Sequence, residues 1–292
     1  MDKDKHAFLI SVFQFPDYVE KLINMLDGNR SNIYLHINKR NHEDFRTLVE
    51  NVRKKKNVFV VPSIKVNWGG KSLLDSLKIM LTEAYRDNKN QYFHFISGQD
   101  LLCKPIDNLY AFFDANPDLN YLKYYDDEKL NEDRFFKDSL EERIALYHTY
   151  DLLEYRSLFI NKIIEKTFVR FQKMFGIKRN NPESKIVYGE GWFSLNRRAI
   201  SILLQAMENE EYYAKWNYSF ATEEMFTHTV LYPHFKELNV INSSLRYAYW
   251  DQERKKFPAI LDESYYDDII TSGNLFCRKI HPDISAKLLE KF

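Results

Sequence analysis

The hydrophobic positions of the first hundred residues form short apolar runs that alternate with amphipathic stretches. The apolar runs, which have the length of buried strands, are residues 6–13, 32–38, 57–63 and 91–97. Between them, apolar residues recur at helical spacing in residues 17–27, 42–55 and 71–88. Strands that alternate with helices in this order predict a mostly parallel sheet with helices on its faces. We therefore predict an α/β fold of the Rossmann type.

The pattern loosens after Pro105. Residues 117–134 predict a strand that runs into an acidic patch, and residues 152–178 predict a long amphipathic helix with basic residues among its apolar positions. Such a helix more often packs its apolar face on the core and leaves its charges in solvent. It can also lie on an anionic membrane. The sequence leaves both explanations open, so peripheral membrane contact through residues 156–175 is a hypothesis.

Composition narrows the classes of partner. Lys plus Arg and Asp plus Glu both count 42, and this formal net charge of zero gives no field that would attract nucleic acid. Cys103 and Cys277 provide neither a disulfide framework nor zinc-binding spacing. The first apolar run is short and is followed by Gln14 and Pro16, unlike a secretory signal, and no run approaches the ~20 residues of a membrane span. We expect a cytoplasmic protein, at the inner face of the membrane if the basic helix binds lipid.

The first candidate site is the stretch FHFISGQDLLCKP, residues 93–105. A buried strand ends there at Ser97 and Gly98, and Asp100 follows at once. Ligand sites of open α/β sheets lie past the carboxyl ends of the strands, which makes Asp100 a candidate for a cleft. An ordinary turn, with Gly98 in an unusual conformation and Asp100 as a helix cap, explains the same residues.

Two further stretches carry candidate residues. In GEGWFSLNRRAI, two glycines bracket Glu190 and precede Trp192, which fits either a platform for a sugar ring or a bulge with a core tryptophan. In SFATEEMFTHTVL, Thr222 resembles a helix N-cap that places Glu223 and Glu224 in the first helical turn. A carboxylate at such a position can serve as a general base, although acidic first turns are common for structural reasons.

The C-terminal part supplies cations. Arg246, Arg278 and Lys279 follow apolar segments and would suit a diphosphate, although surface ion pairs explain each of them singly. The sequence has no HExxH, no CxxC, no phosphate loop of the Walker type and no D-x-D that closes an apolar strand. We therefore expect no bound metal and a leaving diphosphate neutralised by Arg and Lys.

In this order, the segments resemble the core-2/I-branching enzyme family, glycosyltransferase family 14, which includes the peptide O-xylosyltransferases. The resemblance extends over about residues 7–283 and is weakest around 128–180. The stretches that carry it are FISGQDLLCKP, GEGWFSLNRR, TEEMFTHTVL, LRYAYW and FCRKIHP. It implies a GT-A-like fold, an inverting, β-linkage-forming mechanism, a UDP-sugar donor and no metal requirement. We expect one domain, residues 1–292, with a nucleotide-sugar-binding half (1–105), an acceptor-binding and catalytic half (106–292) and a helical insertion at about 128–180.

The resemblance also implies roles for single residues. The family's catalytic base falls on Glu224, and the lysine that contacts the donor diphosphate falls on Lys279, with Arg278 beside it. A second basic group falls within Arg254, Lys255 and Lys256 without a clear choice among them, and Lys256 is named as the donor-binding candidate. The cleft on the acceptor side would include Asp100, Glu190, Trp192, Arg246 and Trp250.

The donor's base pocket falls on the end of the first strand, with Val12, and on two later positions. An Asp of the family is replaced here by Asn38, which puts that nucleobase contact in doubt, and an aromatic residue of the next loop corresponds to Trp68. The disulfides and membrane anchor of the animal enzymes are absent, which fits a bacterial enzyme of surface polysaccharide synthesis.

We therefore hypothesise a transferase that moves a sugar, GlcNAc or xylose, from UDP to a hydroxyl of a glycan or a lipid-linked acceptor. The alternative is a non-catalytic carbohydrate-binding or assembly protein on the same fold. Glu224 and Lys279, both present, favour the enzyme.

Overall fold

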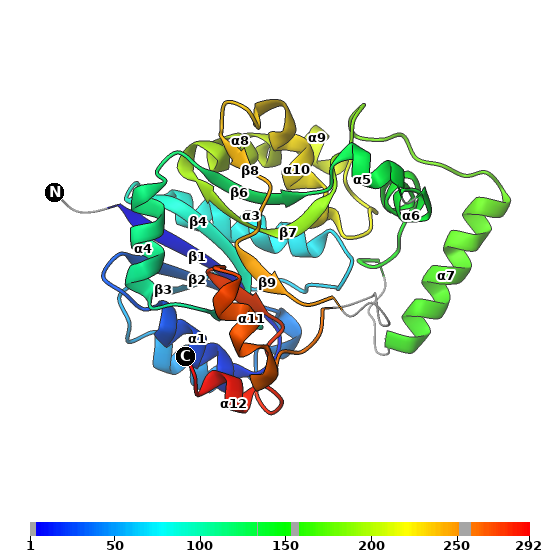
Figure 1. Ribbon diagram of the computed structural model, residues 1–292. Coiled ribbons are helices and arrows are strands. Elements are labelled where there is room, and N and C mark those ends of the chain that lie inside the picture. Colours follow the sequence, from blue (N-terminus) through cyan, green and yellow to red (C-terminus); the bar gives the residue numbers. More distant parts are fainter. Residues whose placement is uncertain (1–3, 133, 153–157, 251–257) are drawn as a thin grey trace.

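A seven-stranded sheet forms the centre of the protein (Figure 1). The structure is a computed structural model that describes residues 4–132, 134–152, 158–250 and 258–292. The strand order is β3-β2-β1-β4-β7-β6-β8; the first four strands in this order are parallel, and β7 runs antiparallel to β4 and β6. The strands are β1 (Lys5–Val12), β2 (Ser31–Ile37), β3 (Val58–Val60), β4 (Asn90–Ser97), β6 (Asn120–Tyr124), β7 (Gly189–Asn196) and β8 (Val240–Ile241).

Helices cover both faces of this sheet. One face carries α1 (Pro16–Leu26), α2 (Arg46–Val52) and α4 (Ile106–Ala115), and the other carries α3 (Ser72–Tyr85), α8 (Arg197–Glu208) and α10 (Phe226–Leu231). The apolar stripe predicted in α1 faces the sheet, where Leu22 and Ile23 are fully buried. The predicted α/β fold with a mostly parallel sheet is confirmed. The second helix is shorter than its predicted segment, 42–55, because residues 42–45 form turns between the 3-10 helix η1 (Lys39–Asn41) and α2, which ends at Val52.

A second, three-stranded sheet lies against the end of β4. It consists of β5 (Leu101–Leu102), β10 (Phe276–Arg278) and β9 (Arg246–Ala248), with β10 antiparallel to β5 and parallel to β9. The C-terminal elements η4 (Glu263–Tyr265), α11 (Tyr266–Thr271) and α12 (Ala286–Leu289) surround it. Because β5 comes four residues after the end of β4, this small sheet brings the C-terminal part of the chain to the end of β4.

Within the described residues, three helices lie between β6 and β7, where the helical insertion is predicted. They are α5 (Asp127–Glu132), α6 (Arg134–Ala145) and α7 (Leu158–Met174), and α7 lies at the outer edge of the molecule (Figure 1). Shorter elements complete the chain: α9 (Glu210–Ala214), η2 (Thr222–Glu224) and η3 (Tyr232–His234). In the described parts of the chain, no helix combines the length and the apolar character that crossing a membrane requires.

Candidate active site

Glu223 and Glu224 lie in η2, which packs directly on β7. Ala221 precedes this turn with a φ of +51°, in the left-handed region that side chains disfavour, and Thr222 lies inside the turn, where its Oγ1 donates to Ser219 O at 3.4 Å. The predicted helix N-cap at Thr222 is therefore wrong, since α10 begins only after the turn. At Gly191 of β7, a Cβ would lie 3.0 Å from Glu223 Cγ and 3.8 Å from Glu224 Cγ. The glycine thus allows the close approach of both glutamates to the strand.

The two glutamates differ in their surroundings. Glu223 is only 8% exposed, and its Oε2 has no hydrogen-bond partner among the described residues. Burial, together with the charge of Glu224, raises the pKa of Glu223 to about 8, so that Glu223 is mostly protonated at neutral pH. The side chain of Glu224 is 35% exposed. Glu224 is therefore the carboxylate of this pair that a substrate can reach.

Arg143 of α6 holds Glu224 in place. Its Nη1 donates a hydrogen bond to Glu224 Oε2 at 2.5 Å, and its guanidinium lies 5.3 Å from the ring centre of Phe220. The ring of Phe220 packs in turn against Trp68, with 5.4 Å between ring centres, and Ala221 N donates to Gly69 O at 2.9 Å. These contacts connect the predicted base to the loop that carries the predicted donor-binding tryptophan.

Glu190 and Trp192 of β7 border the same region. Burial raises the pKa of Tyr125 to about 12, and the charges of Glu224 and Glu190 add to this shift, which places both carboxylates near one phenol. On the other side, the guanidinium of Arg278 lies 4.4 Å from the ring centre of Trp192. The structure therefore brings Glu190, Trp192, Glu224 and Arg278 together, as the motifs predict.

Asp100 occupies a different position from the one expected. Its side chain is fully buried, and its carboxylate accepts hydrogen bonds from Arg246 Nε at 3.1 Å and from the backbone N and Oγ of Ser97 at 2.7 and 2.6 Å. Arg246 also donates to the carbonyl oxygens of Phe95 and Ser244. Neither Asp100 nor Arg246 is an open cleft residue, because their ion pair joins β4 to β9 in the interior. Asp100 is therefore not a flexible tip at the cleft, and it caps no helix.

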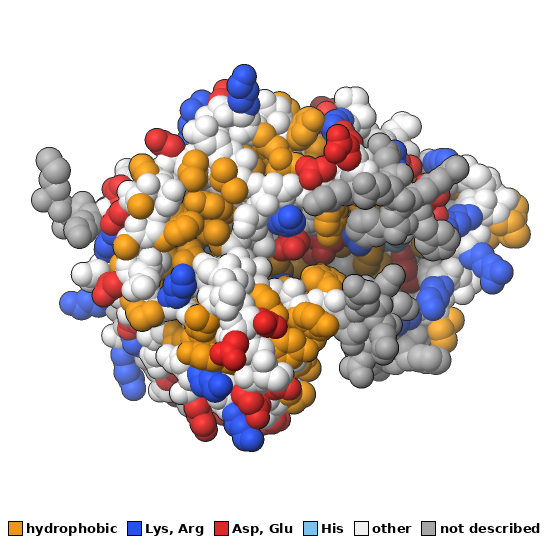
Figure 2. Space-filling view, in the orientation of Figure 1, with side chains coloured by type: hydrophobic (Ala, Val, Ile, Leu, Met, Phe, Trp, Pro, Cys, Tyr) orange, Lys and Arg blue, Asp and Glu red, His pale blue; other side chains and the backbone are white. Residues whose placement is uncertain are grey.

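Lys279 follows β10 next to this buried pair. Its backbone is fixed on both sides, since Lys279 N donates to Ala259 O and Ile280 N donates to Gln99 O. Burial and the neighbouring charge of Arg278 lower the pKa of Lys279, while Asp100 acts in the opposite direction. The SGQD loop thus positions the predicted diphosphate lysine. Figure 2 shows this face hollowed between β9 and the α6–α7 region, with acidic and basic side chains in the hollow.

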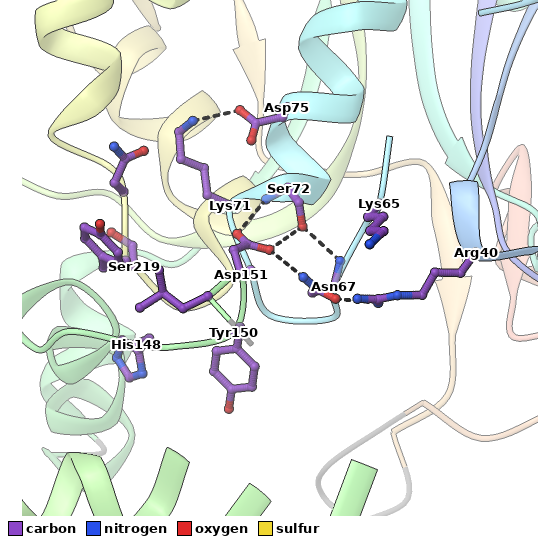
Figure 3. A pocket seen from close by; sticks show the side chains of 14 residues that line it. Arg40, Lys65, Asn67, Lys71, Ser72, Asp75, His148, Tyr150, Asp151 and Ser219 are labelled. Carbon is purple, nitrogen blue, oxygen red and sulfur yellow. Dashed lines mark hydrogen bonds and ion pairs between the residues drawn. The ribbon is translucent and has the colours of Figure 1, made fainter. Parts of the chain in front are cut away.

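Trp68 lies on the loop before α3, and its side chain is 59% exposed. Its neighbours Asn67 and Gly70 line a cavity of about 340 Å³. Figure 3 shows the wall of this cavity, where Asp151 accepts hydrogen bonds from Asn67 Nδ2 at 3.0 Å and from Ser72 Oγ at 2.6 Å. The predicted donor-binding tryptophan is therefore exposed beside a polar cavity. Asp151, which the sequence analysis did not single out, holds the loop to the start of α3.

The remaining predicted donor contacts are less open. The side chain of Val12 is buried beside Gly98. The amide of Asn38 donates to Val66 O at 2.8 Å and accepts from the backbone N of Arg40, so that it is occupied within the protein. The side chains of these two residues are thus buried or bonded within the protein, and their contact with the donor stays a prediction. Trp250 is 51% exposed, and Lys256 lies outside the described residues.

Arg143, like Asp151, is a contact of the site that the sequence does not predict. It lies in the helical region where the family resemblance is weakest, and an arginine in an ordinary amphipathic helix carries no local signal of its partner.

The described residues contain no cluster of metal ligands. Across residues 4–132, 134–152, 158–250 and 258–292, no three His, Cys, Asp or Glu side chains group as metal ligands do.

Comparison with known proteins identifies the family. The model of the family "Branch: Core-2/I-Branching enzyme" matches residues 6–269, which is most of the chain. The chain belongs to the core-2/I-branching enzyme family. Membership in this family implies glycosyltransferase activity, with a sugar donor and an acceptor as substrates. The resemblance to this family is thereby confirmed, and the match includes four of the five stretches; FCRKIHP, with Arg278 and Lys279, lies beyond its end.

Other comparisons add little to this result. A search of curated proteins found no match to the chain. Among solved structures, the chain is similar to a protein of Bacillus anthracis assigned as a glucose-1-phosphate thymidylyltransferase, in complex with sucrose. The identity is 11%, the TM-score is 0.30, and the match covers 68% of this chain and 74% of the other. A likeness of this size carries no argument about function.

Proposed function

We propose that this core-2/I-branching enzyme is an inverting, metal-independent glycosyltransferase that uses a UDP-sugar. The transferred sugar is GlcNAc or xylose, and the acceptor is a hydroxyl of a glycan or of a lipid-linked molecule in surface polysaccharide synthesis. Peripheral contact of the 156–175 helix with a membrane belongs to the same proposal, since a lipid-linked acceptor lies in that membrane.

The observation that carries the catalytic part is the difference between Glu223 and Glu224. Glu223 is buried and mostly protonated at neutral pH, so it is a poor proton acceptor. The side chain of Glu224 is partly exposed, and Arg143 orients its carboxylate. A general base has to reach the proton that it removes, and it has to be ionised. Of the two glutamates, Glu224 is the one suited to this role.

The reaction then proceeds as a single displacement. Glu224 takes the proton of the acceptor hydroxyl, whose oxygen forms a bond to the anomeric carbon of the sugar. The bond between that carbon and the β-phosphate oxygen breaks on the opposite face, and the electron pair leaves with UDP. Lys279 and Arg278 stabilise the negative charge that develops on the diphosphate.

The donor site would extend from these cations to Trp68. The exposed indole of Trp68 offers a surface for the uracil ring, and the adjacent cavity supplies polar groups from Asn67 and Ser72. Asn38 contributes by holding Val66 and the backbone of the loop, and its amide does not have to touch the base.

The second candidate function is a non-catalytic carbohydrate-binding or assembly protein. The exposed Trp68 and the Trp192 ring would serve such a protein equally well. The Arg143–Glu224 ion pair favours the enzyme, because binding alone does not require an oriented carboxylate next to the cations.

Release of UDP from a panel of UDP-sugars in the absence of acceptor separates these functions. Many transferases slowly hydrolyse their donor, so the enzyme should release UDP from one sugar nucleotide above the spontaneous rate. A binding protein would retain carbohydrate affinity and release none. Loss of UDP release in Glu224→Gln, with intact donor binding in calorimetry, would assign the turnover to this site.

A further inference from the structure

The polar and apolar side chains of α7 lie on the opposite faces from those of an ordinary surface helix. In most surface helices, the apolar face packs on the protein and the polar face meets solvent. The side chains with which α7 meets the protein include the polar Asn161, Glu165 and Gln172, all buried. The solvent-facing side of α7, by contrast, carries large apolar side chains that are exposed.

Polar contacts attach α7 to the segment before it. Glu165 accepts hydrogen bonds from His148 Nδ1 at 2.6 Å and from Thr149 Oγ1 at 2.7 Å. Gln172 donates to Tyr147 O and accepts from Tyr147 N, both at 2.8 Å. These bonds fix the rotation of the helix about its axis. The outward direction of its apolar side chains is therefore determined by specific contacts.

The exposed apolar residues form one stripe. A helix turns about 100° per residue, so positions three, four, seven and eight apart share a face. The stripe, named here the α7 apolar face, consists of Ile160, Ile163, Ile164, Phe171, Met174 and Phe175, with exposed fractions from 39% to 71%. A contiguous apolar surface of this kind is typical of a binding site.

Basic side chains run along one edge of the α7 apolar face. Lys162, Lys166 and Arg170 are exposed and recur at helical spacing, and Lys178 follows the helix. The single acidic residue of α7 is the buried Glu165. Figure 2 shows basic side chains over the outer part of the molecule where α7 lies in Figure 1. The charge of this surface is thus positive beside the apolar stripe.

We infer that the α7 apolar face is a docking surface for an anionic membrane. Apolar side chains that insert at the level of the headgroups, with lysines and arginines beside them, are the features of helices that lie in the plane of a bilayer. A second copy of the chain fits less well, because a two-fold contact would bring the same basic edges together without acidic partners. The docking does not depend on the transfer reaction.

The position of the catalytic residues agrees with this orientation. A cavity of about 590 Å³ beneath α7 is lined by Lys166 and Arg170 of α7 and by Arg143, which holds Glu224. A membrane on the α7 apolar face would therefore lie across α7 from this cavity, one helix diameter (~10 Å) from it. This consequence, which favours a lipid-linked acceptor, rests on the proposed function.

Binding to vesicles tests the docking directly. The full chain should sediment with vesicles that contain phosphatidylglycerol, should bind pure phosphatidylcholine vesicles at least tenfold more weakly, and should be released by high salt. Phe171→Glu combined with Met174→Glu should reduce binding at least tenfold, since it places charges in the apolar stripe. Lys162→Gln should reduce binding about fivefold, as expected for one basic residue near an anionic surface.

Ile284→Glu is the matched control, because Ile284 is 50% exposed and lies outside the helical region. It should bind like the wild type. Unchanged thermal unfolding of each variant shows that the fold is retained. Met174→Ser alone gives a milder test at the most exposed position of the stripe.

Two vesicle results would overturn the inference: no preference for anionic vesicles, or full binding by the double variant. A dimer in light scattering that the double variant dissociates would do the same. Because no donor is present, failure here removes the membrane contact from the proposed function and leaves the sugar transfer itself standing.

Discussion

Arg143 and Glu224 form an ion pair that joins α6 to the turn beside β7, with 2.5 Å between Nη1 and Oε2. The arginine contacts Phe220 through its guanidinium, so that the same residue links the carboxylate to the Trp68 loop. A base held in this way has one preferred orientation before the acceptor arrives. Preorganised groups lower the barrier because they need little rearrangement in the transition state.

Glu224→Gln should remove most sugar transfer and preserve donor binding. Loss of a general base typically costs about 10²–10⁴-fold in rate, and the base contacts the acceptor and not the nucleotide. Transfer is measured with the acceptor that the donor screen identifies, and UDP affinity by calorimetry.

Glu223→Gln is the matched control for this substitution, because it replaces a carboxyl group that is already mostly protonated. It should keep near wild-type turnover at pH 7. An inactive Glu223→Gln beside an active Glu224→Gln would move the base by one position and refute the assignment.

Glu223 should make the protein less stable as the pH rises. Its folded pKa of about 8 lies above the ordinary value of a glutamate, so the folded state binds more protons than the unfolded state between about pH 4.5 and 8. Stability therefore decreases with rising pH across this window. Glu223→Gln removes the effect and should be more stable than the wild type at pH 8 by about 1–3 kcal/mol.

Urea unfolding at pH 5 and at pH 8 checks this prediction. The difference between wild type and Glu223→Gln should be small at pH 5 and larger at pH 8. An equal difference in unfolding free energy between wild type and Glu223→Gln at pH 5 and at pH 8 would mean that Glu223 is ionised in the folded protein. Glu223 would then again be a candidate for the general base.

The sequence predicts the sheet well and the site in part. Runs such as residues 91–97 predict strands because a strand buried on both faces is apolar at most of its positions. The insertion of β7 between β4 and β6 cannot be read in the same way, because pairing between distant strands leaves no local pattern. The motifs led to the predictions for Glu224 and Lys279, whereas Arg143, the partner of Glu224, lies 81 residues away from it.

The choice between Glu223 and Glu224 shows the same limit. Helical periodicity from residue 222 onward places both near an edge of the helix and does not separate them. The structure separates them because Ala221 adopts a left-handed conformation and η2 turns Glu223 inward. A positive φ at an alanine has no signal in the sequence. Likewise, the sequence predicts Asp100 in a cleft because a carboxylate that follows a strand is typical of a ligand site. The same pattern arises when the carboxylate pairs with a buried arginine, and the sequence does not distinguish the two cases.

Trp68→Ala should weaken UDP binding by about 1–3 kcal/mol if the indole stacks on the uracil. The ring is exposed enough to accept a base, and its contacts with Phe220 and Tyr150 hold it by the edge. Isothermal calorimetry with UDP measures the effect, and Trp68→Phe, which keeps an aromatic face, should recover much of the loss. Unchanged affinity in Trp68→Ala would limit this residue to a structural role.

Arg246→Met should destabilise the protein by about 3–5 kcal/mol, because it leaves the carboxylate of Asp100 buried without its cation. The two side chains are 1% and 0% exposed, so water cannot replace the lost partner. Urea unfolding measures the change. Arg246→Met combined with Asp100→Asn should recover part of the stability, since no buried charge remains. A double variant as unstable as the sum of both single variants would show that the two residues act independently.

Activity should persist in excess EDTA, because Lys279 and Arg278 are proposed to neutralise the leaving diphosphate. Both residues lie at the end of β10, where Gln99 and Ala259 fix the backbone around Lys279. Lys279→Ala should then lower donor turnover strongly, and added manganese should not rescue it.

The donor affinity of the wild type should also depend on pH. Burial and the charge of Arg278 lower the pKa of Lys279, so this lysine should lose its proton, and the protein its donor affinity, at a lower pH than a lysine with an ordinary pKa would. UDP-release assays with chelator and with manganese measure the first effect, and calorimetry across alkaline pH measures the second. Activity that disappears in EDTA and returns with manganese would assign the charge to a metal ion instead of to these two side chains.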